Sequence, residues 1–187
     1  MGKTAKLPTR IDRFWGDHRF LSNFYIQSVR LWIAPDGTPF GREIPDYVAI
    51  EDYDSVEHAY QAGKSLKVDE RAKFRIRGVT PAIAKRMGGS LKKLRPDWEL
   101  PESNGRMTKV NLMRDLLVQK FQPTVLRRRL MSTFSATLIE GNNWHDEFWG
   151  VCDGTCDRGP HEPGGLNLLG RLLTEVRSFY GMGTPLE

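Results

Sequence analysis

"DSVEHAYQAGK", residues 54–64, has the features of a helix that begins at a capping residue and continues through small apolar side chains. Ser55 is a favoured N-cap residue and no proline follows before residue 68, so we predict a helix over 55–67. The chain before it is rich in strand-forming and turn residues, whereas amphipathic helical patterns follow it. This order predicts an α+β fold, mostly helical, with a small N-terminal β region.

The neighbouring elements are predicted from the same signals. "VRLWIA" and "YVAIE" are β-rich runs on either side of the turn-rich "PDGTPFGREIPD", which indicates a hairpin or a loop between neighbouring strands. The first fifty residues are therefore expected to be strand and loop, and "SATLIEG" is expected to be a further strand. Helices are also predicted over 69–77, 102–121 and 123–131, the last with a proline start. A short helix is capped by Thr80, has Pro81 at its first position and is closed by Gly88. The last predicted helix is "NLLGRLLTEVRSFYG", which ends at Gly181.

Length and composition indicate the class of protein. The chain has 187 residues, of which 39% are hydrophobic and 27% charged, and this predicts a single globular domain over residues 1–187. It contains no apolar run near 18 residues and no signal-peptide pattern at its start, so we expect a cytoplasmic protein without a membrane partner. Two cysteines are too few for a disulfide framework. The oligomeric state is left open.

The positive charge is concentrated in the middle of the chain. Between residues 64 and 129 there are 18 Lys and Arg against 6 Asp and Glu, a net charge of +12 within a chain whose total is +5. These residues are either solvated helix faces or, if they share one surface, a patch that attracts phosphates. The second alternative favours a polyanionic substrate.

The predicted helix at 55–67 carries a glutamate and a lysine on one side. Seven residues at about 100° each bring Lys64 back to within roughly 20° of Glu57, about 10 Å further along the helix. Gln61 lies between them, and all three are expected to border an apolar stripe at the edge of the core. The stripe consists of Val56, Ala59, Tyr60, Gly63 and Leu66.

Several clusters elsewhere combine aromatic with polar residues in predicted loops. They are "FLSNFY" (20–25), "RPDW" (95–98) and "NNWHDEFWG" (142–150). Most such aromatic residues belong to a core, but flat apolar walls next to hydrogen-bonding groups also suit a nucleotide. "GGLNLLG" (164–170) adds a glycine-rich turn into a helix, whose amides could meet a phosphate, although its spacing matches no phosphate-binding motif.

Taken together and in order, these clusters resemble the NADAR (NAD and ADP-ribose) superfamily, the YbiA-like N-glycosidases. The matching motifs are "FLSNFY", "SVEHAYQAGK", "RPDW" followed by "KF", "LIEGNNWHDEFWG" and "GLNLLGRLLTEVR", and they span about residues 14–180. The resemblance implies a mostly helical α+β domain that hydrolyses an N-glycosidic bond. Its substrate would be ADP-ribose attached to guanine in DNA or RNA, or a free early intermediate of riboflavin synthesis.

The resemblance also implies roles for the helix pair. Lys64 would form an imine with the opened ribose while Glu57 acts as acid or base; alternatively, Glu57 activates water and Lys64 makes only an electrostatic contact. The imine route is favoured, because the apolar stripe would desolvate Lys64 and lower its pKa, although Glu57 would oppose this. Asp146 is the expected second acid. A non-catalytic module that only binds ADP-ribose is the rival from another class of function, and it would not need this pair.

The family motifs place further residues at a substrate pocket. Trp98 would stack on a ring of the substrate or, equally well, pack in the core. The expected substrate-binding set is Ser22, Asn23, Phe24, Tyr60, Trp98, Trp149, Gly150, Asn167 and Gly170.

The segment "VCDGTCDRGPHEPGG" departs from the family pattern, in which the connection between the "FWG" and "GLN" motifs is shorter. It could tailor the substrate, and it also suggests a metal, because two Cys and two His are a zinc ligand set. These are His145, Cys152, Cys156 and His161. Their spacing is not that of a usual zinc finger and the chain is large enough to fold without a metal, so neither a metal nor another cofactor is expected. His18 and His58 are expected to be ordinary surface or core residues.

Overall fold

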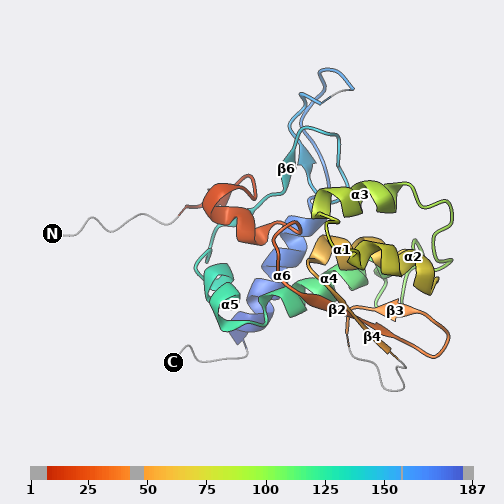
Figure 1. Cartoon of the computed structure of the whole chain (residues 1–187). Coiled ribbons are helices and arrows are strands. Elements are labelled where there is room, and N and C mark those ends of the chain that lie inside the picture. The colour runs from red at the N-terminus through yellow and green to blue at the C-terminus, as the bar shows by residue number, and fades with distance from the viewer. Residues whose placement is uncertain (1–7, 43–48, 157, 183–187) are drawn as a thin grey trace. The chain divides into compact units, whose positions relative to one another are not determined.

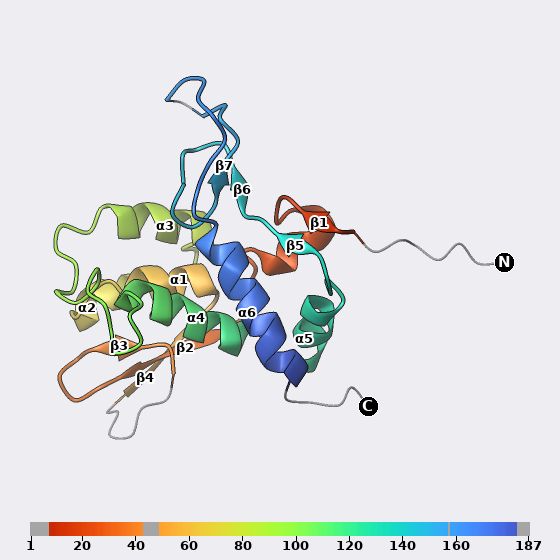
Figure 2. The same cartoon turned by 180° about the vertical axis from the view of Figure 1, so that it is seen from behind.

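The computed structural model describes residues 8–42, 49–156 and 158–182. The chain divides into two compact units: Asn23–Gln122 is one, and the second combines Met1–Ser22 with Pro123–Glu187. Helices and small sheets are mixed in an α+β fold, which confirms the predicted class (Figures 1 and 2). Whether the chain is a single domain stays a prediction.

The unit 23–122 is built around one short helix. α1 (Val56–Ala62) contacts α3 (Pro81–Gly89), α4 (Thr108–Phe121) and the antiparallel sheet of β3 (Pro39–Phe40), β2 (Val29–Ile33) and β4 (Ala49–Tyr53). α2 (Val68–Ala72) and a 3-10 turn, η2 (Lys73–Arg75), follow α1. The prediction of a hairpin or a loop between neighbouring strands is confirmed in its second form: β2 and β4 are antiparallel neighbours, paired from Val29↔Tyr53 to Ile33↔Ala49, and β3 precedes β4 and pairs with β2. Tyr47 and Val48 of the predicted second strand lie outside the described residues.

Cap residues fix the starts of two helices as predicted. The Ser55 hydroxyl accepts from the His58 N–H at the start of α1, and Thr80 accepts from the Ile83 N–H before Pro81 at the start of α3. The predicted bounds of several helices were wrong. α1 ends at Ala62, so 55–67 is not one helix, and α4 begins at Thr108, because an isolated bridge pairs Pro101 with Met107.

The residue after α1 is closely packed. A Cβ on Gly63 would lie 2.5 Å from Leu112 Cδ2, so glycine allows α4 to approach where the helix stops. All seven residues of α1 are buried, whereas Leu66 is 38% exposed. Glu57 and Gln61 are therefore inside the unit and not at the edge of its core, and the apolar stripe ends before Leu66.

The second unit holds two parallel strand pairs and two longer helices. β1 (Arg10–Ile11) pairs with β5 (Thr137–Leu138), and β6 (Gly141–Asn142) pairs with β7 (Val151–Cys152). α6 (Leu168–Met182) contacts α5 (Thr124–Met131) and β5 (Figure 2). η1 (Gly16–Leu21) is a 3-10 helix that the prediction of strand and loop for the first fifty residues missed, and α6 continues through Gly181.

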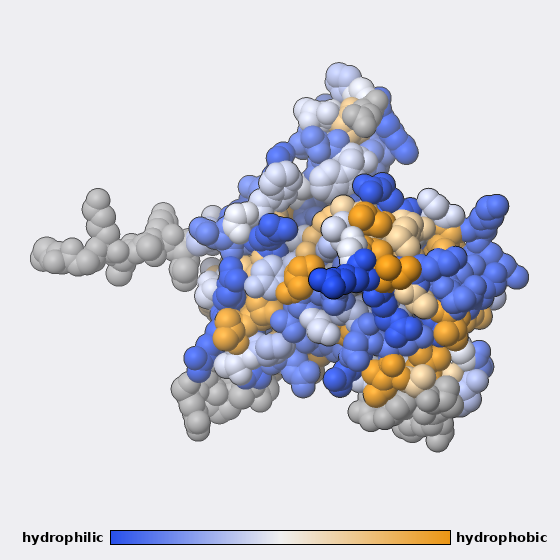
Figure 3. All heavy atoms as spheres, in the orientation of Figure 1, coloured by the Kyte–Doolittle hydropathy of each residue, from blue (hydrophilic) through white to orange (hydrophobic). Residues whose placement is uncertain are grey.

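The face of the molecule seen in Figure 3 is mostly hydrophilic. On the face seen in Figure 3, hydrophobic residues form separate groups among hydrophilic ones. No helix among the described residues combines the length and the apolar character needed to cross a membrane.

Candidate active site

Glu57 lies in the first turn of α1 with its carboxylate buried. It is 6% exposed, and its Oε1 accepts from Gln61 Nε2 at 2.8 Å, one helical turn further on. Its backbone N–H donates to the Asn23 carbonyl at 3.2 Å, which ties the "SNFY" motif to the start of the helix. A carboxylate held by a neutral amide in a buried position is suited to accept or donate a proton.

Two buried acceptors beside this carboxylate have no hydrogen-bond partner among the described residues: Asn23 Oδ1 and Gln61 Oε1. Asn23 is 8% exposed and its Nδ2 reaches only the Met113 sulfur at 3.4 Å, a weak contact. Buried polar atoms without partners are rare in folded proteins, because each costs free energy. Each could accept a hydrogen bond from a donor that reached it.

Lys64 follows α1 in a turn. Its ammonium donates to the Gly88 carbonyl at 3.5 Å and lies 5.8 Å from the centre of the Tyr60 ring. Desolvation by burial lowers the pKa of Lys64, while Glu57 acts in the opposite direction, as the sequence predicted. The positive charges of Lys109 and Lys85 lower the Lys64 pKa further. An amine with a lowered pKa is unprotonated more often and is a better nucleophile.

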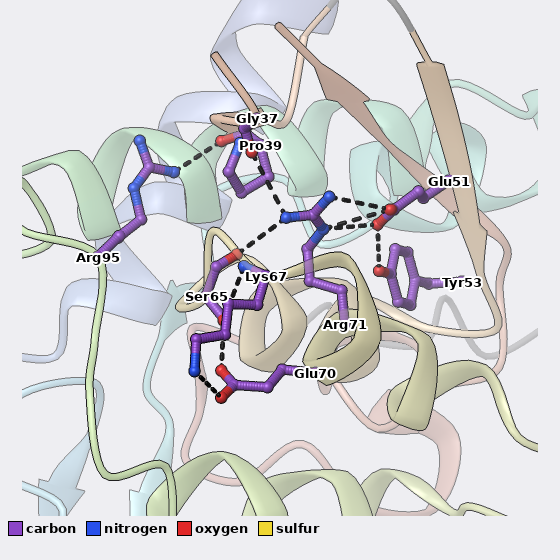
Figure 4. A network of polar contacts seen from close by, with 9 residues as sticks. All are labelled: Gly37, Pro39, Glu51, Tyr53, Ser65, Lys67, Glu70, Arg71 and Arg95. Carbon is purple, nitrogen blue, oxygen red and sulfur yellow. Dashed lines mark hydrogen bonds and ion pairs between the residues drawn. The ribbon is translucent and has the colours of Figure 1, made fainter. Parts of the chain in front are cut away.

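Two hydrogen bonds hold the backbone at Lys64 and Ser65, one from the Arg95 backbone and one from the Arg71 side chain, and Figure 4 shows the second. The Arg95 N–H donates to the Lys64 carbonyl at 2.8 Å, and the Arg71 guanidinium donates to the Ser65 carbonyl at 3.2 Å. Arg71 is fully buried and is neutralised by Glu51, whose Oε2 also accepts from the Tyr53 hydroxyl at 2.7 Å. Burial raises the pKa of Tyr53, so its hydroxyl stays protonated and donating.

The "RPDW" motif has a structural role in this unit. Arg95 makes two bonds of 2.6 Å to Asp97 and one of 2.7 Å to the Pro39 carbonyl. Trp98 is 3% exposed, and its ring centre lies 5.1 Å from that of Tyr60. Such burial corresponds to a packing tryptophan, the second of the two roles considered for it.

Two polar side chains of the other unit that were predicted to belong to the site, Asn167 and Asp146, are bonded to backbone. Asn167 Nδ2 donates to the Leu138 carbonyl at 2.9 Å, and its Oδ1 accepts from the Glu140 N–H at 3.1 Å. Asp146 Oδ1 accepts from the Trp149 N–H at 2.9 Å and so stabilises a turn. The Asn167 side chain therefore holds the backbone of residues 138 and 140 in this structure, whereas the sequence predicted that it binds substrate.

The glycines of this segment permit close backbone approach. A Cβ on Gly170 would lie 2.1 Å from the Leu138 carbonyl oxygen, and one on Gly150 would lie 2.2 Å from that of Glu140. The N–H groups of Asn167, Leu168 and Leu169 already donate to the carbonyls of residues 150, 148 and 149. These amides at the start of α6 are therefore occupied by backbone, and the phosphate site suggested by "GGLNLLG" lacks them.

The predicted residues fall into two groups. Glu57, Lys64, Tyr60, Trp98, Asn23 and Phe24 belong to the unit 23–122, where the first four lie on or beside α1. Ser22, Asp146, Trp149, Gly150, Asn167 and Gly170 belong to the other unit. Gln61 was not among the predicted site residues; its spacing of four from Glu57 was the signal that could have identified it.

Comparison with known proteins agrees with the motifs. The model of the NADAR domain matches residues 12–179. The chain belongs to the NADAR family. Among its relatives, the riboflavin biosynthesis protein PYRR of Zea mays is 33% identical over 170 residues, which is 88% of this chain and 24% of that protein.

Other members of the family are similar at comparable levels. N-glycosidase YbiA of Escherichia coli K12 is 39% identical over 124 residues (65% of this chain, 66% of YbiA), and an N-glycosidase of Nostoc punctiforme is 32% identical over 144 residues (74% and 82%). The NMR structure of E. coli YbiA matches the fold with a TM-score of 0.63 and 29% identity, covering 95% of this chain and 88% of that one. The chain thus spans less than the full length of these NADAR proteins, and only about a quarter of the maize one.

Proposed function

We propose that this protein is an N-glycosidase that removes ADP-ribose from guanine bases in DNA or RNA. The observation that carries the proposal is the pairing, around α1, of the buried Glu57 carboxylate with the Lys64 amine, whose pKa is lowered. A module that only bound ADP-ribose would need neither group. The names of the E. coli and Nostoc relatives, both N-glycosidases, support the same reaction type.

The favoured route uses Lys64 as the nucleophile. The ribose ring opens to an imine between its anomeric carbon and the guanine amine. Lys64 Nζ adds to that carbon, a proton passes to the guanine nitrogen, and the bond between carbon and guanine breaks. Water then hydrolyses the lysine imine, which releases the ribose aldehyde and the free amine. Glu57 moves the protons in these steps. In the alternative, Glu57 activates water directly and Lys64 makes only an electrostatic contact.

The test traps the imine. Borohydride added during turnover of an ADP-ribosylated guanine oligonucleotide should leave the protein heavier by the sugar-nucleotide adduct, with the adduct on Lys64 in peptide maps. Lys64→Arg keeps the charge but forms no imine, so it should lose adduct and activity together. Lys67→Arg is the matched control, because Lys67 is exposed and pairs with Glu70 at 3.2 Å.

The outcomes separate the candidates. An active Lys64→Arg enzyme without adduct would eliminate the imine route and leave activation of water by Glu57. Binding of ADP-ribose without turnover of any substrate would support the binding module.

A second substrate class, a free riboflavin intermediate, is favoured by one observation, the similarity to the maize riboflavin biosynthesis protein.

The salt dependence of binding separates the two substrate classes. The exposed basic side chains of residues 64–122, which could contact phosphates, include Lys73, Arg75, Lys85 and Lys93. If the substrate is a nucleic acid, the logarithm of the binding constant should fall with that of the salt concentration, with a slope of about −0.7 per phosphate contact for single strands. A flat salt response together with turnover of a free riboflavin intermediate would assign the second class.

A further inference from the structure

A cluster of four metal-binding side chains lies within residues 145–161, and it includes neither Glu57 nor Lys64. One ligand atom from each of His145, Cys152, Cys156 and His161 lies within 4.8 Å of the others. Both cysteines are buried free thiols. The spacing of the four in the sequence argued against a metal, but the folded backbone brings them together.

The distances agree with a tetrahedral site. With Zn–S near 2.3 Å and Zn–N near 2.05 Å, tetrahedral angles place two nitrogens about 3.3 Å apart and a nitrogen and a sulfur about 3.6 Å apart. The two imidazole nitrogens facing each other, His145 Nδ1 and His161 Nε2, are 3.3 Å apart. His161 Nε2 lies 3.5 Å from Cys152 Sγ and 3.3 Å from Cys156 Sγ, and His145 Nδ1 lies 3.4 Å from Cys156 Sγ.

Both histidines are oriented by oxygens outside the cluster. His161 Nδ1 lies 2.8 Å from the Glu162 carbonyl oxygen, which can only accept, so this nitrogen carries the proton and the Nε2 lone pair faces the sulfurs. His145 directs Nδ1 inward, and its Nε2 lies 3.6 Å from the Glu147 carboxylate. An outer oxygen on the second ring nitrogen is the usual arrangement for histidines that bind zinc.

The backbone around the cluster is shaped to bring the ligands together. His145 adopts φ +62°, a conformation that costs free energy for a residue other than glycine. A Cβ on Gly154 would lie 2.2 Å from the His161 carbonyl oxygen, so glycine is needed where the chain turns back. Residues 153–163 contain few apolar side chains and are assigned no helix or strand where described. A hydrophobic core cannot hold such a loop, and a metal would.

We propose that His145, Cys152, Cys156 and His161 bind one structural Zn²⁺. Two thiolates and two neutral imidazoles neutralise the charge of the ion and complete its coordination, which leaves no position for substrate. Two thiol protons are released on binding. Cys152 exchanges both backbone hydrogen bonds with Gly164, so the metal would hold the segment that leads into Asn167 and α6.

The first experiment measures metal in the whole chain, purified without chelator. Elemental analysis should find about one zinc per chain. Replacement by Co²⁺ should give the visible bands of tetrahedral cobalt and a sulfur-to-cobalt charge-transfer band in the near ultraviolet. This spectrum needs no variant, so the test survives if a variant fails to fold.

The variants assign the site. Cys156→Ser and His161→Gln should each lose the cobalt bands and most of the zinc, whereas His18→Gln, which removes a histidine outside the cluster, should keep both. A reduced wild-type chain that binds neither zinc nor cobalt would overturn the proposal. So would a Cys152–Cys156 disulfide in the purified protein, stoichiometric iron in place of zinc, or full zinc retention in both cluster variants.

Discussion

The helix α1 and the segment 138–170 both carry family motifs, but they use polar side chains in opposite ways. Around α1, the acceptors of Asn23 and Gln61 have no partner among the described residues. In the segment 138–170, the amide of Asn167 is bonded at both ends to backbone. A motif residue with spare hydrogen-bonding capacity is a candidate for binding substrate, whereas one whose capacity is used by backbone maintains the fold.

The largest expected effect is on activity at α1. Glu57→Gln keeps the shape of the side chain and its place beside Gln61 but cannot exchange a proton, so turnover should fall by about 10²–10⁴-fold. The melting temperature and ADP-ribose binding should change little. Steady-state kinetics with thermal unfolding measure both, and Glu102→Gln, outside α1, is the control. Activity within about tenfold of wild type, under 1.4 kcal/mol of transition-state stabilisation, would remove Glu57 from the mechanism.

An intermediate effect separates the two asparagines directly. Asn167→Ala leaves the Leu138 carbonyl and the Glu140 N–H without their partner, which should cost about 1–3 kcal/mol of unfolding free energy for each group that stays buried. Asn23→Ala removes an unpartnered acceptor and a weak contact to sulfur, so it should lower activity more than stability. Denaturant unfolding and kinetics on both variants test this. If Asn23→Ala proved the less stable of the two, the distinction between the regions would fail.

The smallest expected effect is a pH dependence. The pKa of Lys64 is lowered below that of an ordinary lysine, and the imine route needs the unprotonated amine. Activity and the fraction trapped by borohydride should therefore both rise with pH, at most tenfold per pH unit, and level off below about pH 10.4, the ordinary lysine value. A pH profile of kcat/KM measures this. A rate that declines as pH increases through this range would contradict a nucleophilic Lys64.

Local signals predicted helix starts better than helix ends. Ser55 and Thr80 act through their own first turns, so the sequence suffices to place them. Leu112, some fifty residues away, packs against Gly63 just after the end of α1 at Ala62. The start of α4 follows a bridge between Pro101 and Met107. Such tertiary contacts leave no periodic pattern in the sequence.

The same distinction between local signals and tertiary contacts applies to the candidate site. Desolvation of Lys64, with Glu57 opposing it, could be predicted because both residues belong to one short segment. The pair of Arg71 and Glu51 could not, since a buried ion pair between a strand and a helix twenty residues apart looks like two ordinary surface charges in the sequence. The cysteine and histidine cluster was likewise judged on its spacing and on the size of the chain, neither of which describes a loop that turns back at Gly154.

In the proposed imine route, the hydrogen bonds that the Arg95 backbone N–H and the Arg71 guanidinium donate to two carbonyls would also affect the entropy of the reaction. Fixing one residue's backbone costs about 1–2 kcal/mol of conformational entropy at room temperature. At Lys64 and Ser65 this cost is met when the protein folds, because Arg95 and Arg71 bind their carbonyls in the folded chain. Only the rotations of the lysine's four-carbon stem, up to about 2 kcal/mol, are left to be restricted when the amine meets the sugar. A lysine on an unanchored loop would lose the conformational entropy of its backbone and of its side chain at every turnover. The two hydrogen bonds would therefore lower the entropy cost of bond formation.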